Sequence, residues 1–299
     1  MSEGGTTTVA TAIVALTGIL WGFYWLPVRR LADAGLSGAW GTMAMTLAAA
    51  CLLSPLVFSG RNQFTRANTV AILATALGGA AFALYSIGFL YGRVAIIILL
   101  YFLTPVWSAL IAHFIMGWHT PSLRIVAIAV GLAGLAVMLG ADGQWPLPRG
   151  AGEWMALASG ILWSVATTGI RARSDLDPVP AAFVFAVGAT LAALVLAPFL
   201  EPWPSGALGG DLRAIAALAV GTGGLWWALS TAALLWATAR LEPARVGILL
   251  MTEVLVGAVS AAFLAGEHLG PLEMAGGALV LCAGMLEVWP TSRGGGRDA

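Results

Sequence analysis

The sequence reads ALTGILWG at residues 15–22 and LASGILWS at residues 157–164, so an identical Gly-Ile-Leu-Trp run occurs twice, 142 residues apart. Two further matches follow in the same order, at offsets of 148 and 150 residues: LTPV (103–106) with MTEV (251–254), and Ala-Gly (133–134) with Ala-Gly (283–284). All three offsets are close to half of the 299-residue chain. This order predicts an internal repeat, with one copy in residues 1–145 and the other in residues 146–299.

Ten apolar runs, bounded by Gly, Pro or charge, match the length of a transmembrane helix, which takes roughly 20 residues to cross a hydrocarbon core of about 30 Å. The runs are residues 8–28, 38–59, 68–91, 94–116, 123–141, 152–171, 179–199, 212–238, 244–265 and 271–289. Five runs fall in each copy, and because five is odd, the second copy must cross in the opposite sense. The sequence therefore predicts an all-α integral membrane fold of ten transmembrane helices, arranged as two inverted five-helix repeats, an architecture typical of secondary transporters.

The composition excludes a soluble protein and favours a lipid bilayer as the surrounding medium. Of all residues, 60% are hydrophobic and 9% are charged, whereas a soluble domain carries about 25% charged residues. Ten spans leave about 100 residues for loops and tails. That length is too short for a separate catalytic domain.

The charged and metal-binding residues exclude several further classes of protein. The chain has 14 basic and 14 acidic residues, so no excess charge would attract nucleic acid. All the basic residues are Arg, which excludes a P-loop, because that motif needs a Lys on the phosphates. The three His and two Cys are too dispersed for a metal site, and no nucleophile constellation is recognisable. We therefore expect no enzyme activity, no metal and no cofactor.

The distribution of Arg predicts the orientation, because cytoplasmic loops are enriched in basic residues. The side that holds the N-terminus carries nine: Arg61, Arg66, Arg124, Arg171, Arg173, Arg240, Arg245, Arg293 and Arg297. The other side carries five: Arg29, Arg30, Arg93, Arg149 and Arg213. Both termini are therefore expected in the cytoplasm.

Three motifs carry a family resemblance: GILWG (18–22), LTPV (103–106) followed by Gly117, and FLAGE (263–267). With them, essentially the whole chain resembles the ten-helix EamA-type branch of the drug/metabolite transporter superfamily. Within that superfamily it is most similar to the aromatic amino-acid exporters of bacteria. The resemblance implies export of aromatic and other neutral amino acids, and of related small metabolites, across the bacterial inner membrane. The sequence departs from the family pattern at Glu253, where the second repeat commonly has Pro.

Aromatic and hydroxyl residues are the candidates for substrate binding. Trp21 and Trp163 are related by the repeat, and each shares a helical face with small residues, so the pair is predicted to form two walls of a central cavity. The alternative for each ring is ordinary packing or contact with lipid. The other candidates lie in the third, fourth and eighth runs: Tyr85, Tyr101, Thr104, Trp107 and Trp227.

Pro and Gly residues mark candidate hinges. Pro105 lacks an amide hydrogen and frees the carbonyl of Tyr101, which either lines a cavity or is satisfied by the Thr104 hydroxyl. The remaining candidates are two glycine pairs, which either bend a helix or permit close packing: Gly78, Gly79, Gly223 and Gly224.

Glu253 is the one acidic residue deep inside a predicted span. It lies eight residues after Arg245, about 12 Å along a helix. A carboxylate at that depth is costly unless it is protonated, paired or hydrated, which makes Glu253 a candidate for proton coupling. The alternative is a neutral acid that bonds a neighbour such as Thr252 or faces cytosolic water.

The sequence thus predicts a secondary transporter that exports amino acids by alternating access, as a monomer or a homodimer. One alternative is a membrane-embedded enzyme that acts on a lipid or a quinone, which would need clustered ionisable residues near one interface. The other is a passive metabolite channel.

Overall fold

The structure is a computed structural model that describes residues 3–60, 64–65, 68–114, 117, 122–143, 145–173, 176–205, 211–241 and 243–288. All of its regular secondary structure in those residues is helical. The helices are α1 (Glu3–Gly22), α2 (Trp25–Asp33), α3 (Ala39–Ser59), α4 (Thr69–Tyr91), α5 (Val94–Tyr101), α6 (Thr104–Phe114), α7 (Ser122–Leu139), α8 (Ala151–Arg173), α9 (Pro178–Leu200), α10 (Leu212–Thr222), the π-helix η3 (Gly223–Ser230), α11 (Thr231–Thr238), α12 (Pro243–Leu264) and α13 (Pro271–Val288). Four residues counted for the orientation lie outside the described part: Arg61, Arg66, Arg293 and Arg297.

Helix occurs in each of the ten ranges predicted to span the membrane. Among the described residues, seven helical stretches are long and apolar enough to cross: Gly5–Asp33, Ala39–Ser59, Thr69–Tyr91, Val94–Ile111, Pro178–Leu200, Leu212–Thr238 and Arg245–Leu264. Two shorter apolar helices cover Ile125–Leu139 and Pro271–Leu286, and α8 has sufficient length but a more polar sequence. The chain is therefore a multi-pass membrane protein, while the number of ten crossings stays a prediction.

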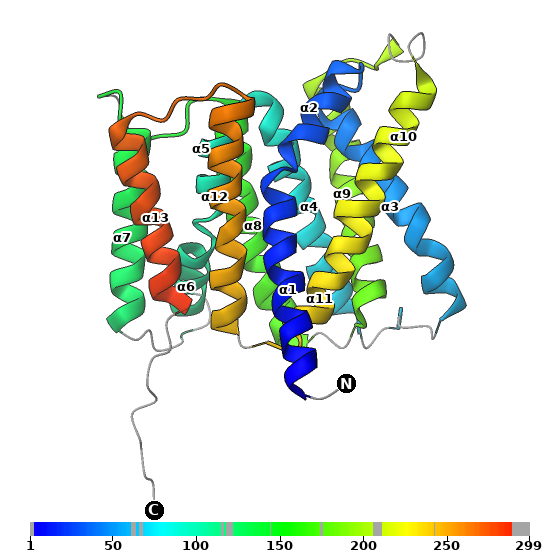
Figure 1. Cartoon of the computed structure of the whole chain (residues 1–299), viewed down its shortest axis with the longest axis horizontal. Coiled ribbons are helices and arrows are strands. Elements are labelled where there is room, and N and C mark those ends of the chain that lie inside the picture. The colour runs from blue at the N-terminus through cyan, green and yellow to red at the C-terminus, as the bar shows by residue number, and fades with distance from the viewer. Residues whose placement is uncertain are drawn as a thin grey trace, which may run out of the picture.

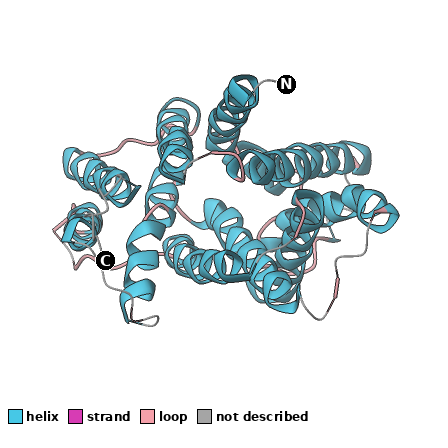
Figure 2. Cartoon of the chain, turned by 90° about the horizontal axis from the view of Figure 1, so that it is seen from below, coloured by secondary structure: helices cyan, strands magenta, loops and turns pink. Residues whose placement is uncertain are grey.

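The helices cross a layer whose upper and lower edges hold their connections (Figure 1), and within this layer they stand in more than one row (Figure 2). α1 starts at the lower edge and α13 ends there, whereas α7 rises to the upper edge and α8 descends from it. The two halves of the chain therefore enter the layer from opposite edges. Seen from below, many of the helices are viewed nearly end-on (Figure 2).

Helices of the two halves pack on each other more than on their own neighbours. The most extensive contacts join α4 to α8 and α9, α3 to α9, α7 to α13, and α1 to α12. Glycine permits these approaches: a Cβ on Gly134 would lie 2.7 Å from the carbonyl oxygen of Gly276, and one on Gly276 would lie 2.6 Å from that of Gly134. Large apolar side chains cover the outside, among them Phe199 and Phe263, each 83% exposed. The core is therefore built between the halves, and the exposed face suits lipid.

Two of the ten helical ranges are broken near their middle or end. The break between α5 and α6 lies at residues 102–103, just before Pro105. The Tyr101 carbonyl, which Pro105 cannot bond, accepts a hydrogen bond of 2.6 Å from the Thr104 hydroxyl. The second break, at residues 23–24, separates α1 from α2. Of the two alternatives for the carbonyl freed by Pro105, the structure therefore shows the one in which the Thr104 hydroxyl satisfies it.

Candidate functional site

Phe82 of α4 lies between the two tryptophans that the repeat relates. Its ring centroid is 5.2 Å from that of Trp21 on α1 and 5.2 Å from that of Trp163 on α8. Trp21 is buried and Trp163 half-buried. The structure therefore brings the predicted pair to one place, through a ring that sequence reasoning did not single out.

Further rings surround Phe82, one from α4 itself and three from α5, α9 and η3. Tyr101 lies 5.3 Å away, Phe185 5.4 Å, Tyr85 5.8 Å and Trp227 6.4 Å between ring centroids. Most of these pairs meet edge to face, which is a favourable geometry for aromatic rings. We call this cluster the aromatic centre: Trp21, Phe82, Tyr85, Tyr101, Trp163, Phe185 and Trp227. The five predicted aromatic candidates other than Trp107 come from five different helices, so only the fold assembles them.

Glu253 of α12 meets the aromatic centre through Tyr85. The Tyr85 hydroxyl donates a hydrogen bond of 3.0 Å to Oε1 of Glu253, and the carboxyl group is buried, with 6% of the residue exposed. Thr252, the predicted alternative partner, instead donates a hydrogen bond of 2.7 Å to the Leu249 carbonyl. None of the three ion pairs found in the described part of the chain involves Glu253. A lone acid therefore faces tyrosines inside the bundle.

A buried chain of hydroxyls runs beside the centre. The indole N–H of Trp227 donates 2.9 Å to the Tyr24 hydroxyl, which lies 2.8 Å from Ser86 Oγ. Ser86 in turn lies 2.8 Å from Thr42 Oγ1. These contacts satisfy the N–H of Trp227 within the protein. Sequence reasoning did not single out Tyr24, because a single polar residue inside an apolar run does not reveal its partners.

Trp107 of α6 is the candidate that stands apart from the ring contacts described above. It packs against the same apolar core as a half-buried side chain. A Cβ on Gly160 of α8 would lie 3.5 Å from its Cδ1. Thr104, the remaining candidate, directs its hydroxyl to Tyr101, while its own carbonyl accepts 2.9 Å from Ser164 Oγ.

The candidate hinge glycines lie at close helix contacts. A Cβ on Gly78 would lie 2.9 Å from Cζ3 of Trp163, and one on Gly79 would overlap the carbonyl oxygen of Phe185. α4 continues without a break through both. Gly223 and Gly224 begin the π-helix η3, where a Cβ on Gly223 would overlap backbone of α3. Gly78, Gly79 and Gly223 thus permit close packing, whereas a Cβ on Gly224 would meet only the tip of the Leu52 side chain, 3.2 Å away. A hinge role of the four stays a prediction.

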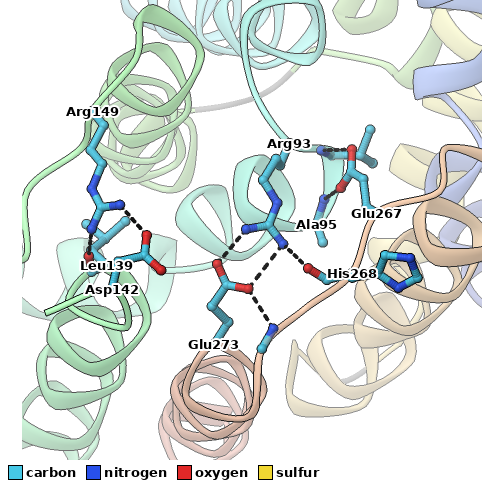
Figure 3. Close-up of polar contacts among 10 residues, drawn as sticks. Arg93, Ala95, Leu139, Asp142, Arg149, Glu267, His268 and Glu273 are labelled. Atoms are coloured by element: carbon cyan, nitrogen blue, oxygen red, sulfur yellow. Dashed lines mark hydrogen bonds and ion pairs between the residues drawn. The ribbon is translucent and has the colours of Figure 1, made fainter.

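Arg93 forms an ion pair at the upper edge (Figure 3). Its guanidinium donates hydrogen bonds of 2.5 Å and 3.1 Å to the two carboxylate oxygens of Glu273, and one of 2.6 Å to the His268 carbonyl. The hydrogen bond to Glu273 raises the pKa of the Arg93 guanidinium above its ordinary value. Arg93 precedes α5 in the first half, and Glu273 begins α13 in the second. The pair therefore ties the two halves together at this edge.

Glu267 strengthens the same connection. Its carboxylate accepts hydrogen bonds of 2.8 Å from the amide of Val94 and 3.2 Å from the amide of Ala95. Amides in the first turn of a helix have no partner within the helix, so Glu267 satisfies two such donors of α5. Arg29, in the middle of α2, donates a further hydrogen bond of 3.3 Å to Glu267. We call the set Arg29, Arg93, Glu267 and Glu273 the upper latch.

The comparisons with known proteins agree with this architecture. Residues 9–140 and 150–288 each match a family model described as "EamA-like transporter family". A search among curated proteins gives no match. Among solved structures 22 chains match. One, titled "Crystal structure of protein", has a TM-score of 0.57 at 20% identity and covers 93% of this chain and 97% of that chain. At that identity the likeness concerns the fold alone.

Proposed function

The chain belongs to the EamA-like transporter family, and on that premise we propose that it is a secondary transporter that exports amino acids and related small metabolites by alternating access. The family membership makes it a membrane transporter of drugs or metabolites. The finer assignment is argued from the hydrogen bond between Tyr85 and Glu253, set beside the aromatic centre.

The charge of the site selects the substrate class. A single buried acid with no cationic partner among the described ion pairs can accept one positive charge from a ligand. The surrounding rings favour an apolar or aromatic body. A neutral amino acid offers both features, because its ammonium group pairs with Glu253 while its side chain packs on rings. A multiply charged solute has no matching partners here and is disfavoured.

Glu253 also provides a physical route to proton coupling. In low dielectric the carboxylate is stable only with a proton or a cation beside it. A proton and the substrate ammonium therefore compete for the same carboxylate, so that release of one favours binding of the other. This competition is the essential feature of an antiporter, in which proton entry drives amino-acid export.

The pairing of the halves supports alternating access. A Cβ on Gly18 would lie 3.3 Å from the Leu249 carbonyl oxygen, and a Cβ on Gly160 would lie 3.1 Å from that of Tyr101. Gly18 corresponds to Gly160 in the repeat, and the positions of Leu249 and Tyr101 correspond as well. Equivalent helices of the two halves therefore make equivalent contacts, as expected of inverted repeats that rock against each other. The upper latch closes the edge that is expected to face away from the cytoplasm.

Countertransport tests the proposal against the channel alternative. Purified protein in liposomes preloaded with an unlabelled neutral amino acid is expected to take up the labelled amino acid faster than empty vesicles do. A carrier shows this acceleration because the loaded site returns to the outside more readily. An equal rate in loaded and empty vesicles would favour a channel.

A further inference from the structure

The Nε1 atom of Trp107 is a buried hydrogen-bond donor without a partner. It is the only buried side-chain nitrogen or oxygen in this condition within the described residues. A buried polar group left unpaired costs about 1–3 kcal/mol, and folded proteins satisfy nearly all such groups. This donor therefore needs an explanation that the folded chain alone does not give.

Four other tryptophans of the bundle interior have their donors satisfied. Trp21 donates 3.0 Å to Ser230, and Trp25 donates 2.9 Å to Ser260. Trp226 donates 2.9 Å to the Leu20 carbonyl, and Trp227 bonds Tyr24. The fold thus places an acceptor opposite each of these indoles. Trp107 differs from them because its buried donor has no such acceptor.

The surroundings of Trp107 connect it to the aromatic centre. Gly160 lies against both the Tyr101 carbonyl and the Cδ1 edge of the Trp107 ring, and Cδ1 is bonded to Nε1. Gly160 precedes Trp163 of the aromatic centre by three residues, about one helical turn. The Cδ1 edge of the indole therefore packs on α8 one turn before the tryptophan of the aromatic centre.

We propose that the indole N–H of Trp107 binds the carboxylate of the transported amino acid. The inference rests on the proposed function, in which Glu253 binds the ammonium group. The ammonium group of the ligand then meets an acceptor on α12, and its carboxylate meets a donor on α6. A charged acceptor suits this donor, because hydrogen bonds to ionised groups are the stronger ones.

The test compares Trp107→Phe with the wild-type protein for two ligands, a neutral amino acid and the matching amine that lacks the carboxylate. Competition against labelled amino acid in countertransport gives the apparent affinity of each. We expect the variant to bind the amino acid about tenfold to a hundredfold more weakly and the amine with little change. Trp154→Phe, which alters a tryptophan of α8 that is 51% exposed, is the matched control and should behave as wild type.

Replacing Trp107 with 3-benzothienylalanine keeps the shape of the ring and removes only the N–H, so it serves if the Phe variant does not fold. An equal affinity of wild type and either variant for the amino acid would overturn the inference. An equal weakening of amino acid and amine would do the same, because the ring and not its donor would then matter. If the wild-type protein binds no amino acid while it still binds the amine, the proposed substrate fails and this inference fails with it.

Discussion

Tyr85 on α4 and Glu253 on α12 are joined by a hydrogen bond of 3.0 Å between residues 168 positions apart in the sequence. The bond links the first half of the chain to the second inside the bundle. It also places the one deep acid of the sequence beside Tyr101, whose ring centroid lies 4.6 Å from that of Tyr85.

Glu253→Gln should abolish the response of transport to a pH gradient, because an amide keeps the shape of the side chain but cannot carry the proton. The amino-acid affinity should also fall about tenfold or more, through loss of the ion pair with the ammonium. The measurement is uptake by proteoliposomes with and without the gradient, at substrate above the raised KM. Glu153→Gln, on the first turn of α8, is the control. A variant that still responds to the gradient would exclude coupling through Glu253.

Trp163→Ala should lower kcat/KM for amino-acid transport at least tenfold while the protein still reaches the membrane. The change removes a ring that contacts Phe82 and Phe185, with centroids 5.2 Å and 6.0 Å away, and so removes one wall of the aromatic centre. Trp154→Ala on the same helix is the control. Unchanged transport kinetics in Trp163→Ala would remove Trp163 from the site.

Gly79→Ala should prevent folding or insertion, because its Cβ would overlap the Phe185 carbonyl of α9 and the two backbones cannot separate without losing their packing. Gly221→Ala is the matched test, since a Cβ there meets nothing within 4 Å. The yield of monodisperse protein and its melting temperature measure both. Equal stability of the two variants would show that α4 and α9 are not packed as described.

The sequence predicts best those features that depend on neighbouring residues in the chain, such as the ends and breaks of helices. Apolar length and the Gly92-Arg93 boundary predict where α4 ends and α5 begins, and Pro105 predicts the nearby break, because both effects depend on the chain within one or two turns. The Thr104 hydroxyl bonds the Tyr101 carbonyl three residues earlier for the same reason.

Contacts between the halves could not be predicted in the same way. Phe82 has no polar or periodic signal that separates it from other apolar residues of its run, although it is the ring on which Trp21 and Trp163 meet. Tyr85 as the partner of Glu253 depends on how α4 packs, which one sequence does not give. The π-helix η3 likewise begins at Gly223, whose close approach to α3 depends on how the helices pack.

Glu267→Gln should loosen the upper edge, because it weakens the ion pair with Arg29 and the acceptor for the first amides of α5. A single cysteine at Ser86, in a chain with Cys51 and Cys282 replaced by Ala, reports the opening. We expect faster labelling by a membrane-impermeant thiol reagent from the outside than in the same chain with Glu267 intact. Arg149→Ala is the control, since its pair with Asp142 joins only the connection between α7 and α8. Equal labelling rates would contradict the latch.

The most direct test of the account is uptake of labelled neutral and aromatic amino acids by proteoliposomes of the purified protein, with the vesicle lumen either at the outside pH or more acidic. We expect uptake of at least one aromatic amino acid, accelerated by the acidic lumen, because protons that leave the vesicle drive the amino acid in. If no amino acid enters under either condition, the substrate assignment and the role of Glu253 are both wrong.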